Sequence, residues 1–414
     1  MTRRLVRGAG AARPDEIRRH NLGLLLEQVH RDGELTRAEL TRRLGLNRST
    51  IGALVADLTS LGLLAEHVPS GSERAGRPSH QVGPRPDGPY VVAVDIEVDR
   101  VTGAAVGLGG RVLARRETRL EAGRSSPADV AEVIAAMVDP LGAALPAVAW
   151  PVGLAASIPG TIRRTDGVVE FAPNLHWQEV GFADLLAAKV RCGLPIHLGN
   201  DADLGALAEH LRGAGRQRDD VVFLNGKIGV GAGIIADGHS LRGHDGLAGE
   251  IGHVMLDPDG PPCRCGGRGC VETYIGEGAL LRLAGRTAAP SRESVHEIVQ
   301  AARAGEARAL NGVRAVGVSL GRTVASLVNL LNPQVVIMGG SLSCVLDVAR
   351  AEVETELNRR AMTASRRGVE LRTAGLGEDS SLLGAAELAF RPLLADPADF
   401  APLPNVAPLR NAAT

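Results

Sequence analysis

Apolar residues in the first part of the chain recur at the spacing of amphipathic helices. A first stripe, which ends at residues 32–33, is formed by Ile17, Leu22, Leu25, Leu26 and Val29. Thr36 and Glu39 have the spacing of a capping box, which predicts a short second helix. After a glycine turn, Asn47 is a suitable N-cap for a third helix. The buried side of that helix is formed by Ile51, Leu54, Val55, Leu58 and Leu61.

The second and third helices, with the short glycine turn between them, match the helix-turn-helix motif. The start of the third helix offers side chains that can reach bases or phosphates, namely Asn47, Arg48, Ser49 and Thr50. A predicted strand at residues 64–67 leads into a basic Gly-Pro hairpin, where Arg74 and Arg77 could enter a minor groove. These patterns predict a winged helix-turn-helix domain that binds DNA, over residues 15–83. The alternative is a small helical bundle that binds protein.

After a linker at residues 84–89, the pattern changes to that of strands. Three strands are predicted within residues 91–120, then a helix at 127–138 and a buried strand at 152–160. After residue 219 a similar order of strands returns. Two similar units predict a two-lobed, actin-like α/β domain over residues 90–392, with lobes at about 90–199 and 200–392. Residues 393–414 have no periodicity and are expected to form a disordered tail.

Composition adds little for the whole chain, because the net charge is −1, but the charge is unevenly distributed. Residues 1–85 contain 14 arginines and 9 acidic residues, which agrees with a DNA-binding role for this region. Residues 1–14 are rich in arginine and are expected to form a mobile arm. No apolar run is long enough to cross a bilayer, and no signal peptide follows Met1, so we expect a soluble cytoplasmic protein.

Three of the five cysteines, Cys263, Cys265 and Cys270, lie within eight residues. The glycines between them allow the tight turns that would aim three sulfurs at one point. With His253 they form a Cys₃His set, which suits one structural zinc ion per chain. A disulfide pair with a spare thiol is the alternative, but clustered cysteines in a cytosolic chain more often bind metal.

Two acidic residues, Glu250 and Glu272, flank this cluster. If the chain near residue 250 is helical, Glu250 and His253 share one face. Carboxylates beside a fixed imidazole can accept hydrogen bonds from a polyhydroxylated ligand such as a sugar. The alternative is that both are solvated surface acids.

The pattern E-x-G-H from Glu250 to His253, followed by C-x-C-G-x-x-G-C-x-E from Cys263 to Glu272, resembles the signature of the ROK family (repressors, open reading frames and sugar kinases). The resemblance implies that His253, Cys263, Cys265 and Cys270 bind zinc. It also implies that Glu250, His253 and Glu272 contact sugar hydroxyls, and that the fold is that of a two-lobed sugar kinase. The N-terminal region is similar to the DNA-binding domain of ROK repressors.

Asn200 and Asp201 follow an apolar strand, where the two lobes are expected to meet. A carboxylate there can take a proton from a sugar hydroxyl, and Asn200 can hold a neighbouring one; a helix cap is the alternative. ROK kinases place their catalytic base at this Asn-Asp, so the resemblance gives that position to Asp201, which we expect to be vestigial. The tract PNLHW at 173–177 also resembles the family, without an assigned role.

Phosphoryl transfer needs glycine-rich loops whose N–H groups hold the phosphates. ROK kinases have a D-x-G-G-T loop after the first strand, whereas residues 95–99 here read DIEVD. Glu97 and Asp99 should repel a triphosphate, although residues 225–231 keep several glycines. ATP binding and kinase activity are therefore not expected.

The sequence thus favours a sugar-responsive transcriptional regulator, acting as a repressor of carbohydrate genes. Its expected partners are operator DNA, a sugar or sugar phosphate, and further copies of itself in a homodimer or a dimer of dimers. Two alternatives stay open. One is a sugar kinase with an accessory DNA-binding domain; the other is a zinc-stabilised sugar-binding scaffold whose N-terminal module binds protein.

Overall fold

The computed structural model describes residues 13–67, 80–121, 124–163, 165–190 and 193–400. Its N-terminal domain contains three helices and a small sheet in the order β1-β3-β2. The elements are α1 (Pro14–Asp32), β1 (Leu35–Thr36), α2 (Arg37–Leu44), α3 (Arg48–Ser60), β2 (Leu64–His67) and β3 (Gln81–Pro84). Thr36 and Glu39 form the predicted capping box, and Asn47 accepts a hydrogen bond from the N–H of Thr50 at the start of α3.

The interior of this domain is formed by the predicted apolar stripes, with one exception. Leu25, Leu26 and Leu54 are buried, whereas Ile17 is 49% exposed because it lies on the first turns of α1, which project beyond the core. The arm expected at residues 1–14 ends earlier, since Arg13 and Pro14 already begin α1. The predicted wing residues Arg74 and Arg77 lie outside the described residues.

The linker predicted at residues 84–89 is a short turn that joins this domain to the next. Pro84 ends β3 and Pro89 begins β4. Between them, the N–H of Arg85 donates to the carbonyl of Leu63 at 3.0 Å, and the Arg85 guanidinium pairs with Asp87. The turn is therefore tied to the N-terminal domain.

The first lobe is built on a five-stranded sheet in the order β11-β7-β4-β5-β6. Its elements are β4 (Pro89–Ile96), β5 (Arg100–Gly107), β6 (Arg111–Arg119), α4 (Pro127–Ala143), β7 (Trp150–Ile158), α5 (Phe182–Val190) and β11 (Ile196–Asn200). A small side sheet contains β8 (Thr161–Ile162), β9 (Val169–Ala172) and β10 (Trp177–Val180). Alternate residues of β4, such as Val92 and Val94, pack on the side covered by α4 and α5.

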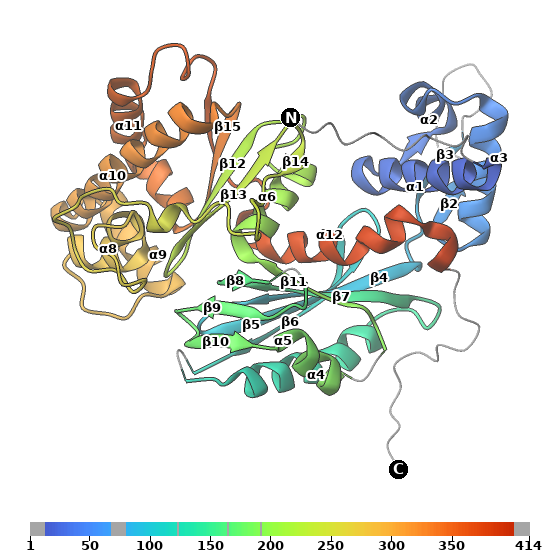
Figure 1. The fold of residues 1–414 in the computed structure, drawn as a ribbon, viewed down its shortest axis with the longest axis horizontal. Helices are drawn as coiled ribbons and strands as arrows, with labels where there is room; N and C mark the ends of the chain where they lie inside the picture. Colours follow the sequence, from blue (N-terminus) through green and yellow to red (C-terminus); the bar gives the residue numbers. More distant parts are fainter. Residues whose placement is uncertain (1–12, 68–79, 122–123, 164, 191–192, 401–414) are drawn as a thin grey trace, which may run out of the picture.

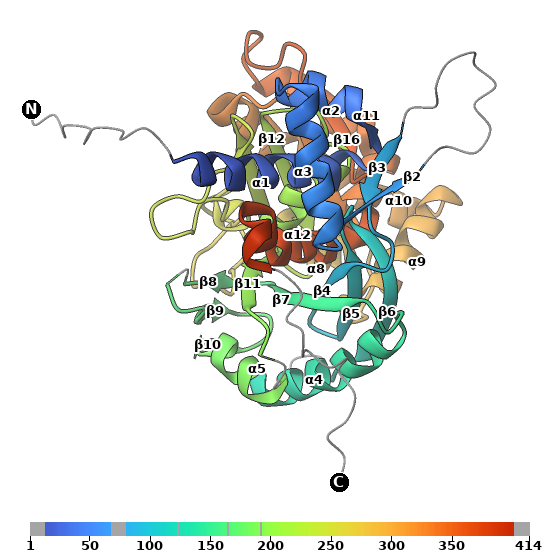
Figure 2. The same ribbon diagram turned by 90° about the vertical axis from the view of Figure 1, so that its right-hand side faces the viewer.

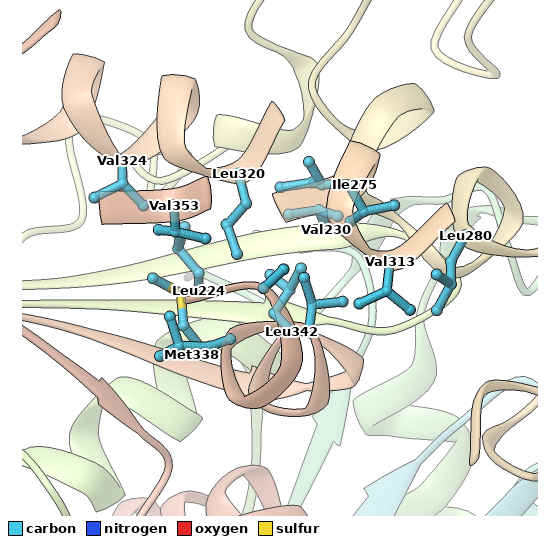
Figure 3. Close-up of a cluster of buried hydrophobic side chains, with 14 of the residues drawn as sticks. Leu224, Val230, Ile275, Leu280, Val313, Leu320, Val324, Met338, Leu342 and Val353 are labelled. Carbon is cyan, nitrogen blue, oxygen red and sulfur yellow. The ribbon is translucent and has the colours of Figure 1, made fainter. Parts of the chain in front are cut away.

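The second lobe repeats a five-stranded sheet, in the order β14-β13-β12-β15-β16. Its strands are β12 (Val221–Gly226), β13 (Val230–Ala236), β14 (His239–Ser240), β15 (Val335–Gly340) and β16 (Glu370–Thr373). Its helices are α6 (Asp201–Arg212), α7 (Glu272–Ile275), α8 (Glu277–Leu283), α9 (Arg292–Arg303), α10 (Ala307–Leu331) and α11 (Ser341–Arg360). Figure 3 shows its aliphatic core, where Leu224 and Met338 of the sheet meet Leu320 and Val324 of α10.

The last helix, α12 (Ser380–Ala395), corrects two expectations. It was assigned to the second lobe, but it packs on the first-lobe sheet, on the face opposite α4, and lies between that sheet and α1 (Figures 1 and 2). Residues 393–400, expected to be disordered, end α12 and form a 3₁₀ turn (Pro397–Phe400). Leu382, Phe390 and Leu393 of α12 bury their side chains in this core, and their burial favours the packing of the helix here.

Within the part of the chain that the structure covers, no helix is both long and apolar enough to span a bilayer.

Candidate functional site

The four predicted zinc ligands come together at one point of the second lobe. The ligand atoms of His253, Cys263, Cys265 and Cys270 all lie within 4.8 Å of one another. The sulfurs of Cys265 and Cys270 are 3.7 Å apart, and Cys263 Sγ is 3.7 Å from His253 Nδ1. Tetrahedral zinc with bonds of about 2.3 Å to sulfur and 2.0 Å to nitrogen requires separations of about 3.5–3.8 Å. The donor set and its spacing therefore fit zinc.

A tight loop brings the sulfurs together. The N–H of Cys263 donates to the carbonyl of Gly267, and a bridge pairs Met255 with Cys270. Gly269 has φ +64°, and a Cβ atom there would lie 1.6 Å from the carbonyl oxygen of Asp257. Only glycine fits such a position, so the loop needs its glycines for close approach as well as for turning.

The two flanking acids begin different elements. Glu250 directly precedes a 3₁₀ turn (Ile251–His253) and lines the cavity described below, and Glu272 begins α7. Burial raises the pKa of Glu250, while His253 lowers it and Glu272 raises it further. Glu272 Oε1 accepts a hydrogen bond from Cys263 Sγ at 2.9 Å, which joins this carboxylate to the metal loop.

The N-terminus of α6 places Asn200 and Asp201 between the lobes, in different roles. Asn200 is a helix cap, because its Oδ1 accepts from the N–H groups of Ala202 and Asp203 and its Nδ2 donates to the carbonyl of Gly160. Asp201 is 8% exposed and accepts a hydrogen bond from Asn225 Nδ2 at 2.9 Å. Burial raises the pKa of Asp201 to about 6. A carboxylate with this pKa could act as a base near neutral pH.

A cavity of about 440 Å³ lies next to these groups and is lined by Asn200 and Glu250. It is also lined by Asp203 and Arg242, which sequence reasoning did not select. Burial raises the pKa of Asp203 to about 7, while Arg242 opposes the rise and Asp201 and Glu250 add to it. The sequence feature that could have identified Asp203 is its position in the first turn of α6, three residues after the Asn200 cap.

The tract PNLHW, which had no predicted role, crosses between the lobes. Asn174 Oδ1 accepts a hydrogen bond at 2.9 Å from Arg264, which lies between two of the metal-loop cysteines. Trp177 is 3% exposed and packs on Phe182 in the first lobe. One end of the tract is thus anchored in the first lobe, and the other reaches the metal loop of the second.

A second cavity is lined by residues 96–100 and 225–229, the two loops compared above with those of kinases, and charged residues bridge it. Lys227 Nζ is 2.6 Å from Glu97 Oε1 and 3.2 Å from Asp95 Oδ2, so a cation from the second lobe meets two carboxylates of the first. Arg100 and Arg292 also approach Glu97, at 3.4 and 3.5 Å. The expected repulsion between Glu97, Asp99 and phosphate must therefore be revised, because these carboxylates are already paired with cations.

The predicted DNA-contacting residues cluster at the start of α3. Arg48 and Ser49 are exposed, and Thr50 is half-buried. Asn47 is exposed, but its Oδ1 is used by the helix, since it accepts from the N–H of Thr50 and from the Ser49 hydroxyl. Arg48 is thus the predicted contact with the greatest freedom to reach a base.

Comparisons with known proteins agree with this architecture. The ROK family model matches residues 91–391. The xylose repressor of Bacillus subtilis (strain 168) is 28% identical over 375 residues, which cover 90% of this chain and 96% of that protein. The glucokinase of Thermotoga maritima is 34% identical over 247 residues, which cover 56% of this chain and 76% of the glucokinase.

Two solved structures show the same fold. A ROK family transcriptional regulator, a homologue of the E. coli MLC protein, superposes with a TM-score of 0.74 at 22% identity over 92% of this chain and 97% of its own. A ROK family glucokinase from Streptomyces griseus, in complex with glucose and AMPPNP, gives a TM-score of 0.62 at 29% identity over 72% of this chain and 98% of its own. The chain therefore belongs to the ROK family.

Proposed function

We propose that this protein is a sugar-responsive transcriptional repressor, in which the N-terminal domain binds operator DNA and the two-lobed domain binds the effector. The observation that carries the proposal is the direct packing of a helix-turn-helix domain on a ROK domain through α1 and α12. The sequence similarity to a xylose repressor, at 28% identity, extends over 96% of that protein and across both domains of this chain. Differential affinity of the sugar for one arrangement of the domains would change the DNA-competent population.

In this proposal the sugar binds between the lobes, with hydroxyls donating to carboxylates. Asn200 and Glu250 line the cavity, and we propose that Asp201, His253 and Glu272 contact the sugar from outside that lining. Carboxylates are acceptors when ionised, and a sugar offers several donors. Zinc, when bound by His253 and the three cysteines, would hold this loop in place. Asp203 and Arg242 join the proposed ligand set because both line the same cavity.

We further propose that the protein has lost kinase activity. Lys227 occupies the region between the two phosphate loops and is neutralised by Glu97 and Asp95. Val98 replaces a glycine of the kinase loop, so the backbone there is less able to surround a phosphate. A nucleotide would have to break a buried ion-pair cluster before it could bind, which disfavours ATP.

A ROK sugar kinase with an added DNA-binding domain is the second candidate. It is favoured by Asp201, a buried carboxylate next to the cavity-lining Asn200 with a pKa of about 6, and by the similarity to glucokinases. A coupled ADP-release assay with ATP and D-glucose or D-xylose separates the two. We expect calorimetry to detect sugar binding and the coupled assay to detect no ADP release. Steady ADP release that disappears in Asp201→Asn would replace the repressor-only proposal with the kinase.

The proposed binding to operator DNA is tested by selecting genomic DNA fragments with the full chain and then footprinting the selected fragments. We expect a palindromic site, because a helix-turn-helix protein usually acts as a dimer on two half-sites about one helical turn apart. A homodimer or a dimer of dimers in the cytoplasm is the form we propose. Failure of the full chain to enrich any sequence would favour the scaffold alternative, in which the N-terminal module binds protein.

A further inference from the structure

A buried polar cluster joins the DNA-binding domain to the two-lobed domain. It consists of His30 on α1, Arg212 at the end of α6 and Glu387 on α12, and the exposed fractions of their side chains are 3%, 11% and 4%. His30 Nε2 lies 2.9 Å from Glu387 Oε2, and Arg212 Nε donates to Glu387 Oε1 at 2.5 Å. Arg212 Nη1 also donates to the carbonyl oxygens of His30 and Gly109. Three elements distant in sequence therefore meet at one histidine.

Polar contacts hold the histidine ring on both of its nitrogens. The N–H of Gly109 donates to His30 Nδ1 at 3.0 Å, and His30 Nε2 lies 2.9 Å from Glu387 Oε2 and 2.7 Å from Arg212 Nη2. Burial opposes ionisation of Glu387, but His30 and Arg212 outweigh it and lower the pKa of this carboxyl to about 2. The cluster thus contains a Glu387–Arg212 ion pair and a histidine whose ring is oriented by the first lobe, α6 and α12.

Helices α6 and α12 form a tightly packed pair that extends from this cluster to the sugar cavity. At Gly384 of α12, a Cβ atom would lie 1.9 Å from the carbonyl oxygen of Leu204 in α6, so the two backbones are in direct contact. Ser381 donates to the carbonyl of Asp201 at 3.0 Å, and Ser380 donates to the buried Glu209 at 2.8 Å. Close packing of this kind moves as a unit, because interiors are not continuously deformable.

The two ends of α6 therefore belong to different sites. Asp201 and Asp203 in its first turn adjoin the sugar cavity, and Arg212 at its last position holds His30, about 17 Å away at 1.5 Å per residue. On the other side, α1 shares a core with α3 through Leu25, Leu26 and Leu54. A displacement of α1 would therefore also displace α3, whose start carries the predicted DNA contacts.

We propose that the His30–Arg212–Glu387 cluster is the joint that transmits the state of the sugar site to the DNA-binding domain. This inference rests on the proposed repressor function and identifies how that function is regulated. The side chains at the rim of the same interface have a different role. Arg19 pairs with Asp396 and Asp399 while 48% exposed, and it adds attachment without the orientation that buried hydrogen bonds give.

The test measures the sugar response of three full-length variants. A DNA fragment selected with the wild-type protein is titrated with and without D-xylose or D-glucose, whichever gives the larger response, and the ratio of the two Kd values is recorded. Couplings of this type are commonly about 5–150-fold. In His30→Leu, which keeps the apolar contact with Phe390 but loses the three polar contacts of the ring, we expect the ratio to fall below about twofold with sugar affinity unchanged.

Two further variants make the result specific. His30→Gln can still donate to Glu387 and should retain an intermediate response, and the rim control Arg19→Ala should retain the wild-type ratio. Melting curves establish that each variant is folded. A wild-type ratio in His30→Leu, or equal loss in Arg19→Ala, would overturn the joint; so would loss of sugar binding in His30→Leu. Absence of any response in the wild-type protein would instead reject the repressor function itself.

Discussion

Removal of Lys227 tests how strongly the ion pairs across the second cavity stabilise the two lobes. Lys227 Nζ contacts Glu97 at 2.6 Å and Asp95 at 3.2 Å, and the exposed side-chain fractions of the three residues are 25%, 15% and 6%. Burial acts to lower the pKa of Lys227, but the two carboxylates raise it overall, so the lysine is charged. Lys227→Met leaves the size of the side chain nearly unchanged and removes that charge.

The expected cost follows from the two carboxylates that lose their partner. At 2.6 Å and an effective dielectric constant of about 20, the attraction to Glu97 is about 6 kcal/mol before desolvation is subtracted. Breaking a buried pair by removal of one partner usually costs about 3–5 kcal/mol. Arg100 and Arg292 remain beside Glu97, and Lys227 is partly exposed, so we expect the lower end, about 3 kcal/mol.

Urea unfolding followed by tryptophan fluorescence measures this loss. Both tryptophans, Trp150 and Trp177, lie in the first lobe, which also carries the two carboxylates. The matched control is Lys189→Met, which removes an exposed pair with Glu132 and should cost less than about 1 kcal/mol. Equal losses in the two variants would refute the reasoning.

A second variant and a ligand complete this test. Asp95→Asn, added to Lys227→Met, should restore part of the lost stability, because it removes the buried charge that lost its cation, whereas Glu97 keeps Arg100 and Arg292. ATP should not raise the unfolding midpoint of the wild-type protein. A midpoint that rises with ATP concentration would mean that the ion pairs open readily and that the cleft still binds nucleotide.

Three further predictions concern the metal, the DNA and the sugar site. Purified protein should contain about one zinc per chain by elemental analysis, and Cys265→Ser should lose it while Cys344→Ser keeps it; full zinc in Cys265→Ser would contradict the ligand set. Arg48→Ala should weaken specific DNA binding by about 1–3 kcal/mol in a titration, whereas the distant Arg350→Ala should not, and equal effects would reject the recognition face. Burial raises the pKa of Asp201 from 3.8 to about 6, so the folded state holds this proton more tightly and stability falls as the pH rises between these values. Asp201→Asn should remove that loss, about 3 kcal/mol at pH 8 and little at pH 3, as measured by urea unfolding; the same gain at both pH values would contradict it.

The local elements could be predicted well because their signals are local. The capping box at Thr36 and Glu39, the N-cap at Asn47 and the cysteine spacing each depend on a few neighbouring residues. The two-lobed fold followed from repeated strand patterns and from a family signature. These features require no knowledge of which distant segments pack together.

Features that depend on distant contacts could not be predicted. The apolar pattern of α12 predicts a helix surface that must be buried, but not that it returns to the first lobe. In the sequence, Lys227 is one residue of a glycine-rich loop, and nothing there indicates that it pairs with Glu97 of the other lobe. Asp203 gained its raised pKa from burial, and His30 gained its partners from α6 and α12, which lie about 180 and 360 residues further along the chain.

The return of α12 has a consequence for the order in which the protein can be completed during synthesis. The core that unites the first-lobe sheet with the N-terminal domain contains Leu382, Phe390 and Leu393, which are synthesised after every strand of both sheets. Until then, apolar residues of β4 and α1, such as Val91 and Leu22, have no partner from α12. Nascent chains therefore expose an apolar surface for most of their synthesis, a state in which aggregation is favoured. Truncation before Ser380 removes α12 and would leave that state permanent, so it should abolish folding of the N-terminal domain and the first lobe as well.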